Sequence, residues 1–256
     1  MKKSAAKKSS YKKNEYHLIG KVIFFPKKEI LAIGDLHIGY ESMLNNQGID
    51  IQFNQLENTK KELKETIKEI NGLGHKIKKI IFLGDIKHYF SFDKAETFQI
   101  KQFLKFLEEY FKKEDIIFIK GNHDVIRISG KKYHDYWIDP SGEIAFTHGD
   151  KLHKEILDKK IRTIVIGHIH PAVTLKEPSG IKKERFKVFL IGRWKNKQLI
   201  IVPSFFPLIE GIEINEFYQD FHKKDFSIIQ NRSIGNFKVF IVGEKSIYEF
   251  GKFKDI

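Results

Sequence analysis

Five apolar runs, each followed directly by a short polar motif, limit the fold of this chain more than any other feature of its sequence. Each run has the length of a buried strand, and the glycines in the motifs allow the chain to turn sharply where a strand ends. The motifs occupy residues 34–37 (GDLH), 84–88 (GDIKH), 121–124 (GNHD), 147–150 (THGD) and 167–171 (GHIHP). Because strands of an α/β sheet present their carboxyl ends at one edge, we expect these polar side chains to meet in one cleft.

The segments around the motifs complete an α/β pattern. Apolar residues on helical spacing predict helices near residues 53–72 and 100–111, and a short one at 152–157. Strands are predicted at 22–25, 30–33, 79–83, 116–119, 144–147 and 161–166, and later at 188–191, 199–202, 226–229 and 237–242. Alternating strands and helices, followed by a strand-rich last third, indicate two packed sheets with helices outside. No linker rich in Pro, Gly or Ser divides the chain, so we predict one domain over residues 16–256.

The charge of the chain points to an anionic partner. Its 256 residues include 46 Lys and Arg against 33 Asp and Glu, a net charge of +13. Residues 1–15 hold six lysines and are expected to form a disordered basic tail, but the remainder is basic too. A basic body is typical of nucleic-acid binding, whereas a lysine-rich composition that serves only solubility is the alternative. The sequence shows no secretory leader and no apolar run long enough for a membrane span, so we expect a cytoplasmic protein without a membrane partner.

The ligand types in the motifs are those of a metal centre without sulfur. The chain has no cysteine, which excludes a thiolate metal site and a cysteine nucleophile. Carboxylates, imidazoles and one carboxamide suit Mn²⁺, Fe or Zn²⁺. The candidate metal ligands are Asp35, His37, Asp85, Asn122, His148, His168 and His170. They are too many for one ion, but two ions that share Asp85 would use them all. Such a pair, about 3.5–4 Å apart, clamps a phosphate and holds a bridging hydroxide as nucleophile.

These motifs resemble those of the calcineurin-like metallophosphoesterases. The ordered family pattern is D-x-H, G-D-x-x-D, G-N-H-[DE], a later H and G-H-x-H, and the chain matches it from residue 34 to 171 except that His88 replaces an Asp. The resemblance implies an α/β fold, a four-layer αββα sandwich of two mixed β-sheets flanked by helices. It also implies two metal sites, one formed by Asp35, His37, Asp85 and His170 and the other by Asp85, Asn122, His148 and His168.

The same resemblance leaves one motif histidine, His123, without a metal. His123 is therefore expected to be catalytic, either as the acid that protonates the leaving oxygen or as a group that stabilises the phosphorane. Asp124 is expected to orient its ring.

Three further residues are candidates for substrate binding: His88, Arg127 and Arg193. His88 has three open roles, namely a donor to phosphate, a support for a metal ligand, or packing against Tyr89. For the two arginines, a solvated surface position is the alternative. The two phenylalanines between the prolines of residues 203–207 are candidates for an exposed contact loop.

A narrower branch of the family shares the GDxKH form of the second motif, residues 203–205 (PSF) and Gly211. This branch contains prokaryotic phosphoesterases related to the SbcD-type repair nucleases, some encoded beside Lhr-type helicases or DNA ligases, and is associated with manganese-dependent DNA nuclease activity. The similarity implies two divalent ions, Mn²⁺ first with Fe or Zn²⁺ as alternatives. It also makes a helicase or ligase a candidate partner.

The function that we expect is a metal-dependent phosphodiesterase that cleaves DNA or RNA in repair or processing. The basic body favours a polymer, because its charges can follow a phosphate backbone. One alternative is a phosphodiesterase or phosphatase for a small nucleotide or a phosphoprotein. The other is a non-catalytic platform in a helicase or ligase assembly.

Overall fold

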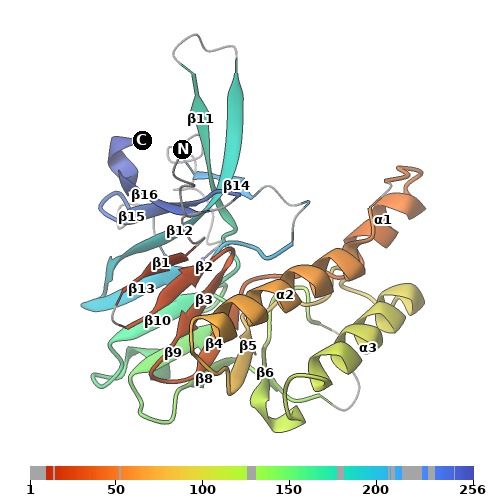
Figure 1. Ribbon diagram of the computed structural model, residues 1–256, viewed down its shortest axis with the longest axis horizontal. Coiled ribbons are helices and arrows are strands. Elements are labelled where there is room, and N and C mark those ends of the chain that lie inside the picture. The colour runs from red at the N-terminus through yellow and green to blue at the C-terminus, as the bar shows by residue number, and fades with distance from the viewer. Residues whose placement is uncertain are drawn as a thin grey trace, which may run out of the picture.

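Two β-sheets pack face to face in the computed structural model, with the helices outside the first sheet (Figure 1). The structure describes residues 10–13, 15–51, 53–125, 131–177, 182–206, 208, 211–214, 227–229, 234–244 and 246–256. The α-helices in these ranges are α1 (Tyr40–Asn46), α2 (Gln55–Gly72) and α3 (Lys94–Glu108). Short 3₁₀ turns lie at η1 (Lys113–Asp115), η2 (Lys154–Leu157) and η5 (Phe253–Asp255).

The first sheet has the strand order β1-β2-β3-β4-β5-β6-β7. Its strands are β1 (Ser10–Lys12), β2 (His17–Ile19), β3 (Val22–Phe25), β4 (Ile30–Ile33), β5 (Lys79–Phe82), β6 (Ile116–Ile119) and β7 (Tyr133–His134). The pairs from β1 to β4 are antiparallel, and those from β4 to β7 are parallel. Consequently β4, β5 and β6 end at the same edge, and each runs directly into one of the polar motifs.

The second sheet has the order β14-β11-β12-β13-β10-β9-β8, and β15 and β16 extend it from β12. Its strands are β8 (Tyr136–Ile138), β9 (Ile144–Thr147), β10 (Thr163–Ile166), β11 (Pro171–Lys176), β12 (Lys183–Trp194), β13 (Lys197–Ile201), β14 (Ile212–Glu213), β15 (Lys238–Val242) and β16 (Ile247–Lys252). Because β9 and β10 are parallel, the motifs after them also share an edge. Both sheets are mixed, as the sequence predicts.

Period-two alternation in the strands builds the core between the sheets. In β5, Ile80 and Phe82 face the helices, whereas Ile81 faces the second sheet. In β10, Val165 faces the first sheet. Strands that are buried on both faces read as continuous apolar runs, which explains why the sequence shows these strands so clearly. This packing holds the ends of the two sheets close enough to form one site.

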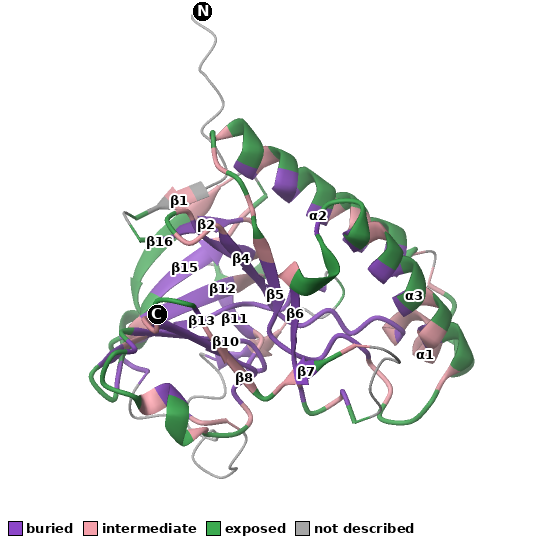
Figure 2. Ribbon diagram, turned by 90° about the horizontal axis from the view of Figure 1, so that it is seen from below, coloured by how far each residue is buried: buried purple, intermediate pink, exposed green. Residues whose placement is uncertain are grey.

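Helices α2 and α3 cover the outer face of the first sheet (Figure 2). Each begins at a side-chain cap: Asn54 accepts from the Glu57 backbone N–H at 3.0 Å, and Asp93 accepts from that of Glu96 at 2.7 Å. These caps satisfy amide groups that otherwise lack partners in a first turn. The apolar residues of α2 and α3 point to the sheet, as Figure 2 shows by the buried stripe along each helix. Ile156 of η2 and Phe253 of η5 pack on the outer face of the second sheet.

Two of the ranges predicted from the sequence differ in the structure. Strand β1 lies inside the expected basic tail and pairs with β2, so the ordered fold begins before residue 16. Of the strand predicted at 226–229, residue 226 lies outside the described residues, and residues 227–229 form no strand, so the prediction is wrong there. Over the described part of the chain, no helix is both long and apolar enough to cross a membrane.

Candidate metal centre

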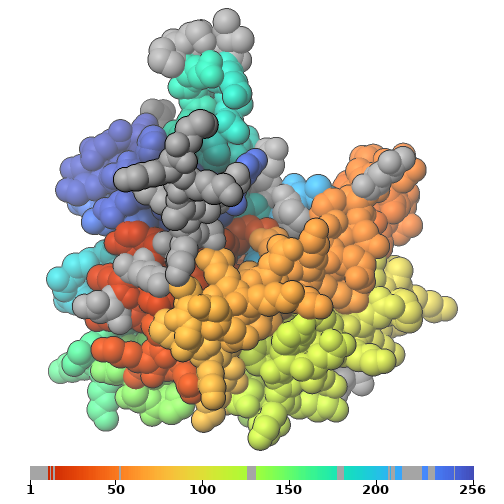
Figure 3. All heavy atoms as spheres, viewed as in Figure 1, coloured from red at the N-terminus to blue at the C-terminus, as the bar shows by residue number. Residues whose placement is uncertain are grey.

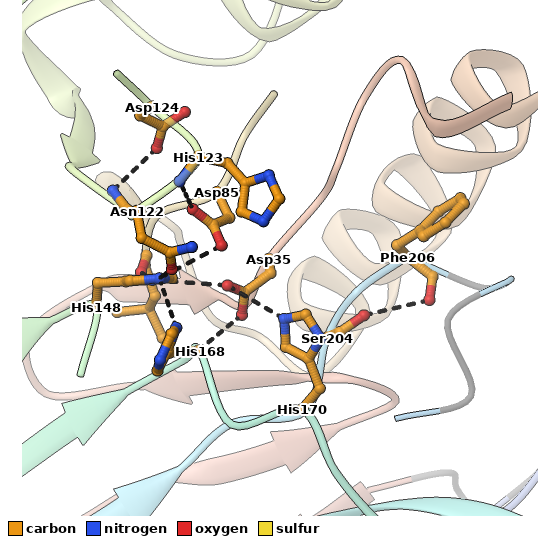
Figure 4. Close-up of polar contacts among 12 residues, drawn as sticks. Asp35, Asp85, Asn122, His123, Asp124, His148, His168, His170, Ser204 and Phe206 are labelled. Carbon is orange, nitrogen blue, oxygen red and sulfur yellow. Dashed lines mark hydrogen bonds and ion pairs between the residues drawn. The ribbon is translucent and has the colours of Figure 1, made fainter. Parts of the chain in front are cut away.

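All five polar motifs meet at the ends of β4, β5 and β6 of the first sheet and β9 and β10 of the second (Figure 4). Besides a group of three histidines (His37, His88 and His123), the structure forms two groups with a carboxylate that could each hold a metal ion. One group contains Asp35, His37 and His170, and the other contains Asp85, His148 and His168. Five of these six residues are buried, and His170 is half-buried.

Four of the six residues have a left-handed backbone. The φ angles are 47° at His37, 46° at Asp85, 64° at His168 and 46° at His170. Residues other than glycine rarely adopt this conformation because the Cβ crowds the backbone. Strain of this kind is kept where the side-chain direction matters more than local stability, and it concentrates at functional sites.

Asp85 ties three of the motifs together. Its backbone carbonyl accepts the N–H groups of Leu36 at 3.1 Å and His37 at 2.9 Å. Its carboxylate Oδ1 accepts the backbone N–H of His123 at 2.8 Å. The neighbouring glycines make room for this, since a Cβ at Gly121 would collide with the Asp85 carboxylate. The first three motifs are therefore held in one arrangement by a single residue.

The group around His148 is closely hydrogen-bonded. His148 Nδ1 donates to the Leu83 carbonyl at 2.8 Å, which leaves Nε2 facing the site. Nε2 lies 3.0 Å from Asn122 Oδ1, 3.0 Å from His168 Nδ1 and 3.4 Å from Asp85 Oδ2. This convergence of lone pairs on one point is the ligand arrangement that a divalent cation requires.

Charge in this group strongly favours a proton on His148. Burial lowers the pKa of a histidine, but the hydrogen bond to Asp85 and the charges of Asp35 and Asp85 outweigh it and raise the pKa of His148 to about 10. A proton on this ring thus occupies the position that a cation would take.

The group around Asp35 contains several buried atoms without a partner. Asp35 Oδ2 accepts the His168 backbone N–H at 3.0 Å, and Oδ1 lies 3.3 Å from His170 Nε2. Asp35 Oδ1, both ring nitrogens of His37 and His170 Nε2 are buried and have no hydrogen-bond partner. Burial also lowers the pKa of His37 to about 3, with the charge of His170 as a further cause. Burial alone would raise the pKa of Asp35, but the neighbouring His170, His148 and His37 hold it below its usual range.

The buried atoms without a hydrogen-bond partner allow us to test whether the site fits a metal ion. Buried polar atoms without partners are costly and call for an explanation. A cation coordinated by Asp35, His37 and His170 would satisfy Asp35 Oδ1, His170 Nε2 and one of the two His37 nitrogens, so the residues fit a divalent metal. The expectation that Asp85 is shared between two ions stays a prediction.

His123 lies beside the two groups that contain a carboxylate and belongs to the group of three histidines instead. Its Nδ1 donates to the backbone carbonyl of His88 at 2.6 Å, and its ring centroid is 5.0 Å from that of His37. The expectation that Asp124 orients this ring is wrong. The Asp124 carboxylate instead accepts the backbone N–H groups of Gly121 at 3.0 Å and Lys87 at 3.5 Å. It is buried, and burial raises its pKa to about 7. Asp124 therefore joins two loops, and a main-chain carbonyl orients His123.

The three candidates for substrate binding lie in different places. His88 lies at the site, half-buried, with Nδ1 unpartnered and Nε2 3.1 Å from Met43 Sδ. Arg127 lies outside the described residues. Arg193 is exposed and pairs in register with Gln198, which in turn pairs with Thr163 at the start of β10. The site is at the opposite end of β10, so the prediction that Arg193 reaches substrate is wrong.

Sequence reasoning missed a loop that supports Asp35. Residues 203–206 turn inward, and the backbone N–H groups of Phe205 and Phe206 donate to the Asp35 carbonyl at 3.0 and 3.3 Å. The prediction of an exposed loop is therefore wrong, because both phenylalanines are buried. Lys187 holds this loop from the second sheet, where its Nζ donates to Ser204 O at 2.9 Å and to Phe206 O. Lys21 holds it from the first sheet through Phe205 O at 2.6 Å.

A buried glutamine was missed in the same way. Gln55, the first residue of α2, donates through Nε2 to the carbonyls of Leu36 at 3.2 Å and His37 at 2.7 Å. It thereby fixes the backbone at His37. Lysine and glutamine side chains in supporting positions have no motif of their own, so no signal in the sequence would have found them.

Known proteins share both the family pattern and the fold. The family model for calcineurin-like phosphoesterases matches residues 28–207. The solved structure of nuclease MPE from Pseudomonas putida has a similar fold, with a TM-score of 0.62 and 18% identity over 95% of this chain and 100% of that chain. No curated protein matches the chain.

Two further solved structures align at lower TM-scores. One is a conserved protein from Streptococcus pneumoniae described as a predicted phosphoesterase, with a TM-score of 0.34 and 14% identity over 87% of this chain and 97% of that chain. The other is Vps29 from Entamoeba histolytica, with a TM-score of 0.37 and 12% identity over 86% and 95%.

The family match covers well over half of the chain and contains every motif that converges on the site. Members of this family are metal-dependent hydrolases of phosphoester bonds, and the ligand groups of the site fit such a metal. The chain therefore belongs to the calcineurin-like phosphoesterases.

Proposed function

We propose that the protein is a metal-dependent phosphodiesterase that cleaves nucleic acid with two divalent ions. The observation that carries this proposal is the pair of ligand groups with a carboxylate, beside a histidine, His123, that belongs to neither of those two. Two divalent cations, when bound, would polarise the phosphoryl group and offset its negative charge. Mn²⁺ is the first candidate, since imidazole and carboxylate ligands together suit it.

His123 is positioned to handle the proton of the reaction. Its Nδ1 is engaged by the His88 carbonyl, which fixes the ring and leaves Nε2 as the atom that can pass a proton to the leaving oxygen. His123 is half-buried and the neighbouring Asn122 is exposed, so substrate can approach from this side. Asp124 supports the role indirectly by fixing the loop that carries both residues.

A polymer substrate is supported by charge and by shape. The hairpin of β11 and β12 begins directly after His170 and rises from the body (Figure 3). Exposed lysines lie along it at Lys176, Lys182 and Lys183. Positive side chains on an arm that starts at the site can follow a phosphate backbone. The similar fold of nuclease MPE agrees with this substrate class.

The test is a hydrolysis assay with Mn²⁺ on bis-p-nitrophenyl phosphate, single-stranded DNA, single-stranded RNA and supercoiled plasmid. We expect cleavage of a polymer that EDTA abolishes and that weakens steeply with salt, by a log–log slope of about 0.7–0.9 for each phosphate contacted. Hydrolysis of the small diester alone would contradict the nucleic-acid assignment. Two bound metals without any turnover would favour the non-catalytic platform, and the helicase or ligase partner stays a prediction.

His123→Ala should lower the rate by about 10²- to 10⁴-fold while both metals stay bound. His75→Ala is the matched control, because His75 is also half-buried but lies beyond the end of α2 beside Phe24. Metal content by mass spectrometry and initial rates would be measured for both variants. An equal loss in the two variants, or loss of metal in the first, would contradict the proton-transfer role.

A further inference from the structure

An exposed aromatic ring lies against His123 at the rim of the site. Phe90 is 57% exposed, although large aromatic side chains usually contribute to a core. Its ring centroid is 4.1 Å from that of His123, and the two planes differ by 28°. Phe90 is thus in stacking contact with the histidine that we assign to proton transfer.

Phe90 is the outermost ring of a short stack. The His123 ring also stacks on that of His88, with centroids 5.5 Å apart and planes 25° apart. Among the described residues, Phe90 makes no ring contact besides the one with His123. The stack therefore ends in an exposed aromatic side chain.

The loop that carries Phe90 is held in place from both sides. Glu96 is buried, and its Oε1 accepts the backbone N–H groups of His88 at 2.7 Å and Tyr89 at 2.8 Å. Lys87 Nζ donates to the carbonyls of Tyr89 and Ser91 on the same loop. An aromatic ring presented by a fixed loop loses little conformational entropy on binding, which favours its use as a contact surface.

We propose that Phe90 is a stacking platform for an unpaired nucleobase next to the scissile phosphate, so that the substrate is a single strand. The proposal rests on the proposed function, because it assumes a nucleic-acid substrate. Every base has a flat face that can stack on an aromatic side chain, whatever the sequence. In a duplex, both faces of a base are already stacked on its neighbours, so only an unpaired base reaches Phe90.

A different reading of the same contact is that Phe90 only holds the His123 ring in place. That role would be indifferent to the bases of the substrate, whereas a platform would require one. The two readings are separated by removing the base rather than by removing the side chain alone.

The experiment measures kcat/KM for thymidylyl-thymidine and for two analogues in which one or the other nucleoside is abasic, at saturating Mn²⁺. In the wild type, loss of one of the two bases should lower kcat/KM by about 5- to 150-fold, the usual range for one stacked base. In Phe90→Ala, this ratio should fall close to one. Phe90→Trp should restore it, because the larger ring still stacks.

Phe98→Ala is the matched control, since Phe98 on α3 is 62% exposed and stacks on no site residue among those described. It should keep the wild-type ratio. A single-stranded oligonucleotide should also be cut faster than the same sequence in a duplex, and Phe90→Ala should narrow that difference.

One result would overturn the proposal while leaving the proposed function intact, namely a base-to-abasic ratio that is the same in Phe90→Ala and the wild type. If that variant also loses kcat/KM equally on all three substrates, Phe90 is only a positioning residue for His123. If the wild type hydrolyses bis-p-nitrophenyl phosphate but no nucleotide substrate, the proposed function fails and the stacking proposal fails with it.

Discussion

The two ligand groups of the site differ in their hydrogen bonding and in whether a histidine holds a proton. In the group around His148, every nitrogen and oxygen that faces the centre has a neighbour, and the raised pKa of His148 keeps a proton there. In the group around Asp35, several buried atoms make no hydrogen bond, and the low pKa of His37 keeps a proton off that ring. A proton on His148 can replace the cation in the first group, whereas His37 holds no proton in the second. We infer that the groups differ in how they respond to pH and to metal.

The largest loss of metal and activity is expected on substitution of Asp85, the residue that we predict to be shared by the two groups. Asp85→Ala should remove both metals and lower activity by about 10³-fold or more, because the reaction depends on the bound cations. The variant also loses the carboxylate that fixes the His123 backbone. Metal analysis and initial rates would check this. Retention of two ions per chain would show that the groups are independent and that Asp85 is not shared.

Substitution of Lys187 should have a smaller effect, which weakens metal binding in only one of the two groups. Lys187→Met removes the donor that holds residues 204–206 against Asp35, and burial holds the pKa of this lysine below its usual range. Loss of such outer support typically weakens metal binding by about 10- to 100-fold. Titration calorimetry should show the loss in the Asp35 group alone. Lys183→Met, exposed on the same strand, is the control and should change neither site.

Proton release should distinguish the two groups directly. At pH 7, His148 with a pKa of about 10 carries a proton that a metal must displace, whereas His37 with a pKa of about 3 carries none. Metal affinity in the His148 group should therefore fall about tenfold for each pH unit below 10. Calorimetry in buffers of different ionisation enthalpy would count the protons. Proton release on metal binding should vanish in His148→Gln and persist in His37→Gln. The reverse pattern would mean that His37, and not His148, carries the proton that the metal displaces.

Arg193→Ala should change kcat/KM by less than about twofold, the usual consequence of removing a solvated side chain. The residue lies at the far end of β12 from the site. Rates on single-stranded DNA would check it, and a large loss would mean that substrate extends across the whole second sheet.

The sequence revealed the strands and the site for the same physical reason. Strands buried on both faces appear in the sequence as apolar runs. The motif after each run was expected at the edge of the sheet where the strands have their carboxyl ends. It could not reveal the partner of His123, because a backbone carbonyl such as that of His88 has no sequence signature. Arg193 was misplaced because the end of the sheet on which a residue lies depends on strand direction, which is set by tertiary pairing.

Supporting lysines were missed for a different reason. Lys21 and Lys187 are surrounded by ordinary sequence, and lysine is usually exposed, so their burial beside residues 203–206 could not be predicted. The same inward loop made the phenylalanines at 205 and 206 part of the core.

The left-handed backbone at His37, Asp85, His168 and His170 also sets a limit on how the protein can evolve. Glycine or asparagine would relax each of these positions, because both tolerate a positive φ better than the residues present. A population of variants selected for heat resistance alone would therefore accumulate glycine and asparagine there and lose the metals. A substitution that stabilises the fold at any of these four positions removes a metal ligand. A more thermostable form of this enzyme must therefore gain its stability at other positions.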